Sequence, residues 1–328
     1  MKLKWTALMF TALFCTALTG CGASAGALQE NADKFNVVCT NFAEYDWARQ
    51  LTKGLENQFE ITYLLENGVD LHNYQPSAAD IAKISTCDLL IYVGGESDHW
   101  VPDALQSAVN PDMQVIRLLD VVQALEEETV EGMEAEEEEE EESDAPEYDE
   151  HVWLSLRNAA QCCSKISEAL RTLEKDPTAT QKLQLNEESY QEQLTALDSE
   201  FLEVSTQTQE KPLIFADRFP FRYFVEDYGY TYYAAFPGCS AETEASFETV
   251  AFLAQKADET GVSMIFTIEG GSSAVAEAVR DSTAAKNQHI VSLNSLQSVT
   301  SDQISEGATY LSLMTDNLNV LKGDAAAT

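Results

Sequence analysis

Two histidines in polar loops are the side chains of this chain best suited to metal chemistry. His72 lies in the segment GVDLHNYQPS at 68–77, and His151 lies in the segment DEHVWLS at 149–155. Each segment leads into a predicted helix, so its side chains can reach a cleft. A neutral imidazole is a good ligand for zinc, and carboxylates can complete such a site. We therefore interpret His72 and His151 as candidate metal ligands.

Carboxylates near His72 can orient the imidazole without binding the metal themselves. Asp70 stands two residues before His72, and Glu96 follows the predicted strand at 88–93. Metal-binding histidines usually give their second ring N–H to a carboxylate, a carbonyl or water. We predict such outer positions for Asp70 and Glu96.

Eight short apolar runs predict the strands that position these loops, and helical patterns alternate with them. The predicted strands are 35–40, 59–64, 88–93, 114–119, 212–216, 230–236, 262–268 and 289–293. The predicted helices are 78–85, 101–109, 155–175, 179–206, 219–228, 246–259, 272–282 and 301–321. Short apolar strands that alternate with helices indicate parallel sheets. The fold class is therefore α/β, with two lobes whose mostly parallel sheets are flanked by helices.

The alternation pauses in the middle of the chain, which sets the domain boundaries. We predict a first lobe over 35–154, connecting helices over 155–207 and a second lobe over 208–328. Ligands of such sheets bind beyond the carboxyl ends of the strands, so two lobes predict a site in the cleft between them.

An acidic segment at 126–150 interrupts the first lobe before His151. It contains seven consecutive glutamates, Glu136 to Glu142, which repel one another, and we predict a mobile loop. The formal net charge of the whole chain is −37. Nucleic-acid binding needs a basic face, so this charge argues against it. An acidic surface instead raises the local concentration of cations.

The N-terminus is typical of an exported lipoprotein. Two lysines and a short apolar run precede Leu18-Thr19-Gly20-Cys21, which resembles the box read by bacterial lipoprotein processing. We predict a signal peptide over 1–20, lipidation of Cys21 and a tether over 21–34. The alternative is an ordinary secretory signal. The other cysteines of the mature chain show no metal-binding spacing, and we interpret most of them as small buried residues.

The two histidine segments resemble sequence motifs of one family, the zinc-uptake and lipoprotein-adhesin receptors of ABC importers. The segment at 68–77 is similar to that family's acidic-x-His-x-Tyr-x-Pro-Ser block, and 149–159 is similar to its Asp-x-His-x-Trp-Leu-Ser block. The acidic segment between them, IFTIE at 265–269 and YLSLM at 310–314 extend the resemblance. It implies a receptor that captures zinc, or alternatively manganese, for an importer permease.

The resemblance implies a ligand set of His72, His151, Asp217 and Glu269. Glu269 matches an acidic residue that ends a strand of the family's second lobe; the alternative is a helix cap. The family's third histidine has no counterpart, because the block after the strand at 212–216 reads FADRFPFRYF. Asp217 is the nearest substitute. Reserve candidates are Glu242 and Glu244.

Two other functions stay open from the sequence. One is a surface adhesion protein with a structural metal, and the other is a metallohydrolase, which needs an open metal position for water. No nucleophile or general-base motif accompanies the histidines, so we expect no enzyme. The expected place of action is the extracytoplasmic face of the cell membrane.

Overall fold

The computed structural model describes residues 34–65, 68–134, 147–208, 212–240 and 244–323. Two four-stranded sheets are present in this part of the chain, and every strand pairing is parallel. The strands are β1 (Phe35–Cys39), β2 (Phe59–Tyr63), β3 (Leu89–Tyr92), β4 (Gln114–Arg117), β5 (Leu213–Arg218), β6 (Tyr232–Phe236), β7 (Met264–Ile268) and β8 (His289–Leu293). The prediction of two parallel α/β lobes is confirmed, and each predicted strand is present.

The two sheets have the same topology. The strand order is β2-β1-β3-β4 in the first and β6-β5-β7-β8 in the second. β2 and β6 are therefore equivalent edge strands, and β1 and β5 are equivalent inner strands. Because all strands of a sheet are parallel, their carboxyl ends meet at one edge, where ligand sites form.

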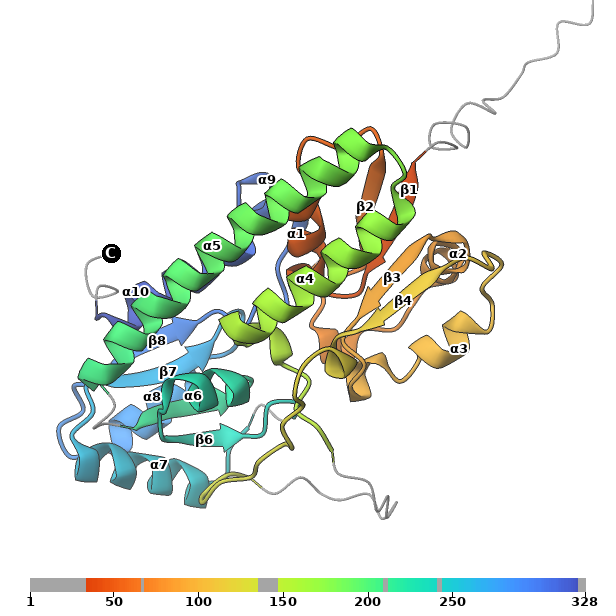
Figure 1. Cartoon of the computed structure of the whole chain (residues 1–328). Helices are drawn as coiled ribbons and strands as arrows, with labels where there is room; N and C mark the ends of the chain where they lie inside the picture. Colours follow the sequence, from red (N-terminus) through yellow and green to blue (C-terminus); the bar gives the residue numbers. More distant parts are fainter. Residues whose placement is uncertain (1–33, 66–67, 135–146, 209–211, 241–243, 324–328) are drawn as a thin grey trace, which may run out of the picture. The chain divides into compact units, whose positions relative to one another are not determined.

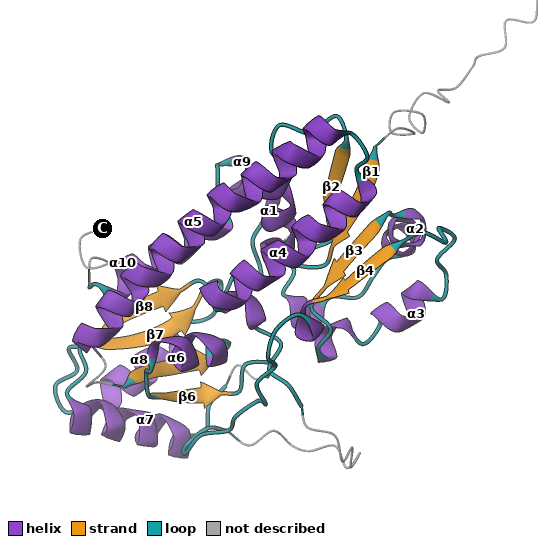
Figure 2. Ribbon diagram, in the orientation of Figure 1, coloured by secondary structure: helices purple, strands orange, loops and turns teal. Residues whose placement is uncertain are grey.

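The helices surround these sheets and connect them (Figures 1 and 2). They are α1 (Phe42–Leu51), α2 (Ala78–Thr86), α3 (Val101–Leu105), α4 (Leu156–Leu173), α5 (Pro177–Thr208), α6 (Arg222–Tyr228), α7 (Phe247–Thr260), α8 (Ala274–Ser282), α9 (Ser301–Ser305) and α10 (Tyr310–Leu321). Helix α4 begins where the Ser155 side chain accepts a bond from the Asn158 N–H, as an N-cap serine typically does.

The paired helices α4 and α5 link the two lobes. They pack along each other, as Figure 1 shows. Near one end of α5, Asn186 donates to the carbonyl of Leu51 at the end of α1. Near its other end, Glu200 pairs with Lys322 and Asp198 accepts a bond from Tyr228. The long helix therefore contacts elements of both lobes.

The C-terminal helix predicted over 301–321 is two helices. Gly307 has a positive φ of 105°, a backbone conformation that ends α9 soon after Ser305. Thr309 then caps α10 by accepting a bond from the Ser312 N–H. The apolar periodicity continues through this break, which is why the sequence pattern reads as one helix.

The described ends of the acidic segment are placed against the rest of the protein. Glu126 pairs with Tyr148 in an isolated antiparallel bridge. The Glu134 N–H donates to the carbonyl of Ala235 on β6, and Thr249 of α7 donates to the carbonyl of Gly132. The stretch 126–134 therefore packs on the second lobe, which differs from the prediction of one mobile loop. The run Glu136 to Glu142 lies outside the described residues.

Among the described residues, no helix is both long enough and apolar enough to cross a membrane.

Candidate metal centre

His72 stands on a short turn beyond the end of β2. A 3-10 helix over Leu71–Asn73 carries it, and Asp70 caps this turn by accepting a bond from the His72 N–H at 3.0 Å. The other carboxylate oxygen of Asp70 accepts from Arg218 of the second lobe at 2.6 Å. Asp70 therefore supports His72 through the His72 backbone N–H, whereas the prediction was that it orients the imidazole ring.

His151 stands on a second turn, immediately before the 3-10 helix Val152–Leu154, and its side chain is fully buried. Asp149 Oδ1 accepts from the His151 N–H at 2.8 Å and lies 3.0 Å from its Nδ1. The Trp153 ring packs edge-on against the imidazole and donates its N–H to the carbonyl of Ser295 in the second lobe. These contacts fix both the position and the rotation of the ring.

The hydrogen-bond partners assign one tautomer to both rings. His72 Nδ1 lies 2.7 Å from Ser97 Oγ and 3.1 Å from Glu150 Oε1, and the Ser97 hydroxyl donates to that carboxylate at 2.6 Å. The Nδ1 atom of His72 therefore donates, as does the Nδ1 atom of His151 toward Asp149. In the neutral state both Nε2 atoms are left as acceptors.

These two Nε2 atoms face each other at 3.2 Å. Two lone pairs at this distance repel unless a proton or a cation lies between them. A tetrahedral ion with bonds of ~2.0–2.1 Å holds two nitrogens about 3.3 Å apart. The histidine pair therefore has nearly the spacing that a shared metal ion requires.

Negative charge surrounds the pair. Burial alone would lower the pKa of His151, but Asp149 and Glu150 outweigh it and raise this pKa above its ordinary value. Burial would likewise raise the pKa of Glu150, but the bond and charge of His72 dominate and lower it to about 2. The site is thus built for a positive charge, whether a proton or a metal ion.

A cysteine thiol lies close to the two imidazoles. Cys239 follows β6, and its Sγ and one nitrogen from each of His72 and His151 all lie within 4.8 Å of one another. The other described cysteines, Cys39, Cys87, Cys162 and Cys163, are buried and free. The interpretation as small buried residues fits those four and does not fit Cys239, which is partly exposed.

The two carboxylates predicted as second-lobe ligands lie outside this group of three. Asp217, on β5, accepts from the N–H groups of Arg218 at 2.8 Å and Ile268 at 3.1 Å. Glu269, just past β7, accepts from the Ser295 N–H at 2.6 Å and from its hydroxyl at 2.7 Å. Burial raises the pKa of both carboxyls, and these bonds oppose the rise. Their role as ligands stays a prediction.

Asp217 and Glu269 share a cavity of about 330 Å³ with Asp70 and Arg218. The ion pair of Asp70 and Arg218 joins the first lobe to the second there, and it holds the pKa of Asp70 below its usual value although burial acts in the opposite direction. This cavity is the acidic side of the cleft between the lobes.

The remaining predicted site residues fall elsewhere. Glu96 is exposed on the short turn Glu96–Asp98, and its carbonyl accepts a bond from His99. Glu244 is exposed. Glu242 and Cys21 lie outside the described residues.

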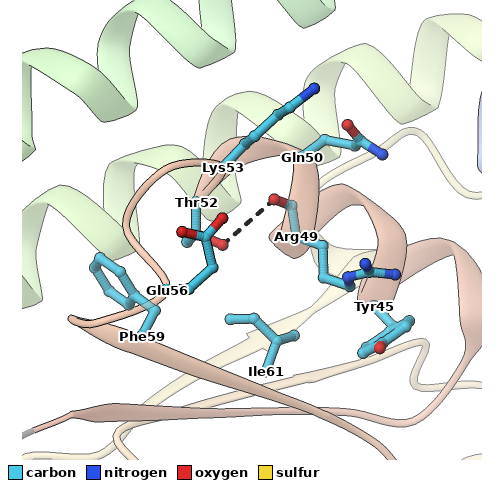
Figure 3. A pocket seen from close by; sticks show the side chains of 8 residues that line it. All are labelled: Tyr45, Arg49, Gln50, Thr52, Lys53, Glu56, Phe59 and Ile61. Carbon is cyan, nitrogen blue, oxygen red and sulfur yellow. Dashed lines mark hydrogen bonds between the residues drawn. The ribbon is translucent and has the colours of Figure 1, made fainter.

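A second hollow of about 410 Å³ lies on the outer side of the first lobe, between α1 and β2. Figure 3 shows its lining, in which Thr52 bonds the carbonyl of Arg49. The Arg49 guanidinium lies over the Tyr45 ring at 5.3 Å, and Glu56 accepts a bond from Gly54. Its charges are mixed and it contains none of the predicted site residues.

Sequence reasoning missed four residues of the centre besides Cys239. Asp149 and Glu150 directly precede His151 in one block, so their role could have been inferred from proximity. Ser97 and Gln297 had no local signal, because they reach His72 from distant loops; Gln297 Nε2 lies 3.1 Å from His72 Nε2.

Two parallel α/β lobes with a facing pair of histidine Nε2 atoms define a two-lobed metal-binding protein. Residues 37–323 match the family described as "Zinc-uptake complex component A periplasmic", and the chain belongs to this family.

Named relatives agree with this assignment. The chain is 28% identical over 321 residues to the "High-affinity zinc uptake system protein ZnuA" of Bacillus subtilis, covering 97% of each. It is 28% identical over 324 residues to the "Zinc-binding lipoprotein AdcA" of Streptococcus pneumoniae, covering 98% of this chain and 61% of that protein. The chain thus spans about three fifths of that relative's length.

Solved structures share the fold. The Zn(II)-bound ZnuA-like domain of Streptococcus pneumoniae AdcA superposes with a TM-score of 0.70 at 25% identity, covering 88% of this chain and 98% of that chain. The laminin-binding protein Lmb of Streptococcus agalactiae superposes with a TM-score of 0.69 at 18% identity, covering 88% and 98%, which shows the fold alone.

Proposed function

We propose that this protein is an extracytoplasmic receptor that captures a zinc ion in the cleft between its lobes and delivers it to an ABC importer. The observation that carries the proposal is the facing pair of Nε2 atoms at 3.2 Å, each left as an acceptor by the partner of its own Nδ1. The uptake-system family and the zinc-binding names of the relatives support zinc as the cargo. Manganese is the alternative cargo.

In this proposal His72 and His151 bind the ion through Nε2, with Asp149, Ser97 and Glu150 holding the rings. From the second lobe, Glu269 and Asp217 are the sequence-predicted ligands. Each already accepts two bonds, but carboxylate oxygens have further lone pairs with which to bind a metal. The relatives are named as binding and uptake proteins, which favours a binding role over the metallohydrolase alternative.

We further propose a lipid anchor at Cys21, with a signal peptide over 1–20 and a tether over 21–34. The sequence around Cys21 and the lipoprotein name of one relative support it. Two acyl chains hold a protein stably on a membrane surface. Partition of the Cys21→Ala protein into the aqueous phase of a detergent extraction is the expected result, whereas unchanged membrane retention and mass would contradict the anchor.

Calorimetric titration of metal-free protein tests the receptor function. We expect one zinc ion per chain, a weaker response to manganese, and a melting temperature that rises with zinc because only the folded state assembles the site. Weak binding of several ions, with no 1:1 transition, would overturn the proposal.

A further inference from the structure

We propose that the thiol of Cys239 is the second-lobe ligand of the zinc ion, at the position that sequence reasoning gave to Asp217. This inference rests on the proposed function and names the chemistry of its site. The ion would be held by His72 Nε2, His151 Nε2 and Cys239 Sγ, with Glu269 or a water as the fourth ligand.

The cysteine and the two histidines lie close enough together for one tetrahedral ion. With bonds of about 2.0–2.1 Å to nitrogen and ~2.3 Å to sulfur, the nitrogens lie about 3.3 Å apart and each lies about 3.6 Å from the sulfur. The two Nε2 atoms are 3.2 Å apart, and the Cys239 sulfur lies within 4.8 Å of one ring nitrogen of each histidine. Zinc binding therefore requires the sulfur to come to about 3.6 Å from both Nε2 atoms.

The turn that carries Cys239 is shaped to lie against His151. It reads Pro237-Gly238-Cys239, and a Cβ at Gly238 would lie 3.0 Å from His151 Cε1 and 2.9 Å from the carbonyl oxygen of Phe219. Real Cβ atoms essentially never come as close as the Phe219 contact, and the His151 contact is tighter than most of theirs. A glycine at 238 therefore allows the turn to pack against the His151 ring. This contact places Cys239, the next residue, near the two histidines.

Gln297 gives a second, independent indication of a ligand. Its side chain is buried, with a relative exposure of 1%, and its Nε2 lies 3.1 Å from His72 Nε2. Its Oε1 is buried without a hydrogen-bond partner among the described residues. Buried polar atoms are nearly always paired, so an unpaired oxygen on the side chain that contacts His72 indicates an ion or its bound water.

A metal ion can reach the sulfur from solvent. Cys239 lines a hollow of about 280 Å³ together with Glu127, Glu147 and Glu150. The thiol lies 3.4 Å from Glu150 Oε1 and its own N–H faces Glu127. Carboxylates along this route attract cations and repel anions.

Binding exchanges a proton for the metal. Burial, and then the charges of Glu150 and Glu127, raise the pKa of the Cys239 thiol well above its ordinary value. When zinc binds, the S–H bond breaks, the S–Zn bond forms and the proton leaves to solvent. A soft thiolate favours zinc over manganese, which prefers oxygen ligands, so Cys239 would set the selectivity of the receptor.

Cobalt(II) tests the sulfur directly, because a thiolate bound to cobalt gives an intense charge-transfer band in the near ultraviolet. We expect this band in the parent protein and in a Cys87→Ala control, whose cysteine is buried outside the group. In the Cys239→Ser protein we expect no band, while cobalt still binds the histidines. We also expect its zinc-to-manganese affinity ratio to fall by at least about tenfold.

Alkylation of the parent protein gives a second readout that needs no variant. Zinc should block modification of Cys239 by iodoacetamide, as measured on the peptide that contains it. If the parent binds one zinc ion but shows no sulfur band and no protection, the Cys239 ligand is wrong and the receptor function stands. If the parent binds no zinc, the proposed function fails first, and the cysteine inference fails with it.

Discussion

Asp149 and Glu150 of the first lobe hold the imidazole rings of the metal centre, whereas Asp217 of the second lobe holds the backbone. Asp149 and Glu150 accept from the rings of His151 and His72, directly or through a serine. Asp217, by contrast, accepts from two backbone N–H groups. The two lobes share one sheet topology, so this difference comes from the loops. It teaches that the first lobe prepares the metal site, and that the second lobe completes it.

The sheet equivalence also shows where a second-lobe ligand should be sought. His72 follows β2, the edge strand of the first sheet, and Cys239 follows β6, the equivalent edge strand of the second. The site therefore uses matching loops of the two lobes. Asp217 and Glu269 end the inner strands β5 and β7.

Burial of carboxylates differs between the lobes as well. Among the described residues, the fully buried carboxylates of the two lobes all belong to the first: they are Glu44, Asp46, Asp98, Asp149 and Glu150. Of these, Asp149 and Glu150 raise the pKa of His151 and so favour a positive charge at the histidine pair. The first lobe therefore contributes these two negative charges as well as the two nitrogens.

Removal of either histidine should have the largest effect on binding. Loss of an orienting partner typically weakens metal binding 10–100-fold, so loss of a ligand in His72→Ala or His151→Ala should weaken zinc binding more than about 100-fold. Competition against a chelator of known affinity measures this. His99→Ala is the matched control, because His99 is exposed and outside the centre. If both variants bound zinc as tightly as the parent, the two histidines would not be ligands and the proposed site would be wrong.

Substitutions of the two second-lobe carboxylates, Asp217 and Glu269, should differ in their effects on stability and zinc affinity. Asp217→Asn keeps one acceptor oxygen, but its NH₂ group would face a backbone N–H that now lacks an acceptor. We therefore expect the free energy of unfolding to fall by about 1–3 kcal/mol. Because the Cys239 inference replaces Asp217 as a ligand, the zinc affinity of this variant should stay within about threefold of the parent, a difference under ~0.7 kcal/mol. Glu269→Gln should weaken zinc binding by about tenfold or more, as expected for a fourth ligand or its support. Calorimetry and thermal unfolding measure both quantities.

The outcome for Asp217 discriminates between the two accounts of the site. A loss of zinc affinity above about 100-fold in Asp217→Asn, with unchanged stability, would restore Asp217 as the third ligand and weaken the assignment of Cys239.

The smallest expected effect concerns the buried carboxylates of the first lobe. Burial, together with the charge of Glu150, raises the pKa of Asp98 to about 6, although bonds from Gly94, Val93 and Thr40 act against the rise. An acid whose folded-state pKa is raised stabilises the fold most when protonated, so the parent should lose stability as pH rises from about 4 to 6, by about 1–3 kcal/mol from this group.

Asp98→Asn should therefore show a flatter stability profile over that pH range, because its amide does not titrate but can still accept the backbone bonds. Urea unfolding at several pH values provides the measurement. Parallel profiles for the variant and the parent would show that Asp98 is not the titrating group.

The sequence predicted the fold well because each strand is a short apolar run with polar flanks. The helical pattern over 301–321 failed to show the break at Gly307, since one glycine within a continuing periodicity is a weak signal. The helix α1 was absent from the predicted ranges. Its N-terminus depends on a capping box between Asn41 and Glu44 that precedes a mixed, partly charged pattern.

The candidate site was predictable where ligands and neighbours share one block, as for His151. Cys239 was not, because its approach to the histidines depends on the sheet order and on the contact that Gly238 allows. A ligand contributed by a loop from a distant strand leaves no spacing pattern in the sequence.

A crystal structure of the zinc-loaded protein, with anomalous data collected on both sides of the zinc edge, tests the central claim most directly. We predict one strong peak between the lobes, about 2.0–2.1 Å from Nε2 of His72 and of His151, with a sulfur about 2.3 Å away. A peak that is bound only by surface glutamates, or that lies beyond bonding distance of both imidazoles, would contradict the account.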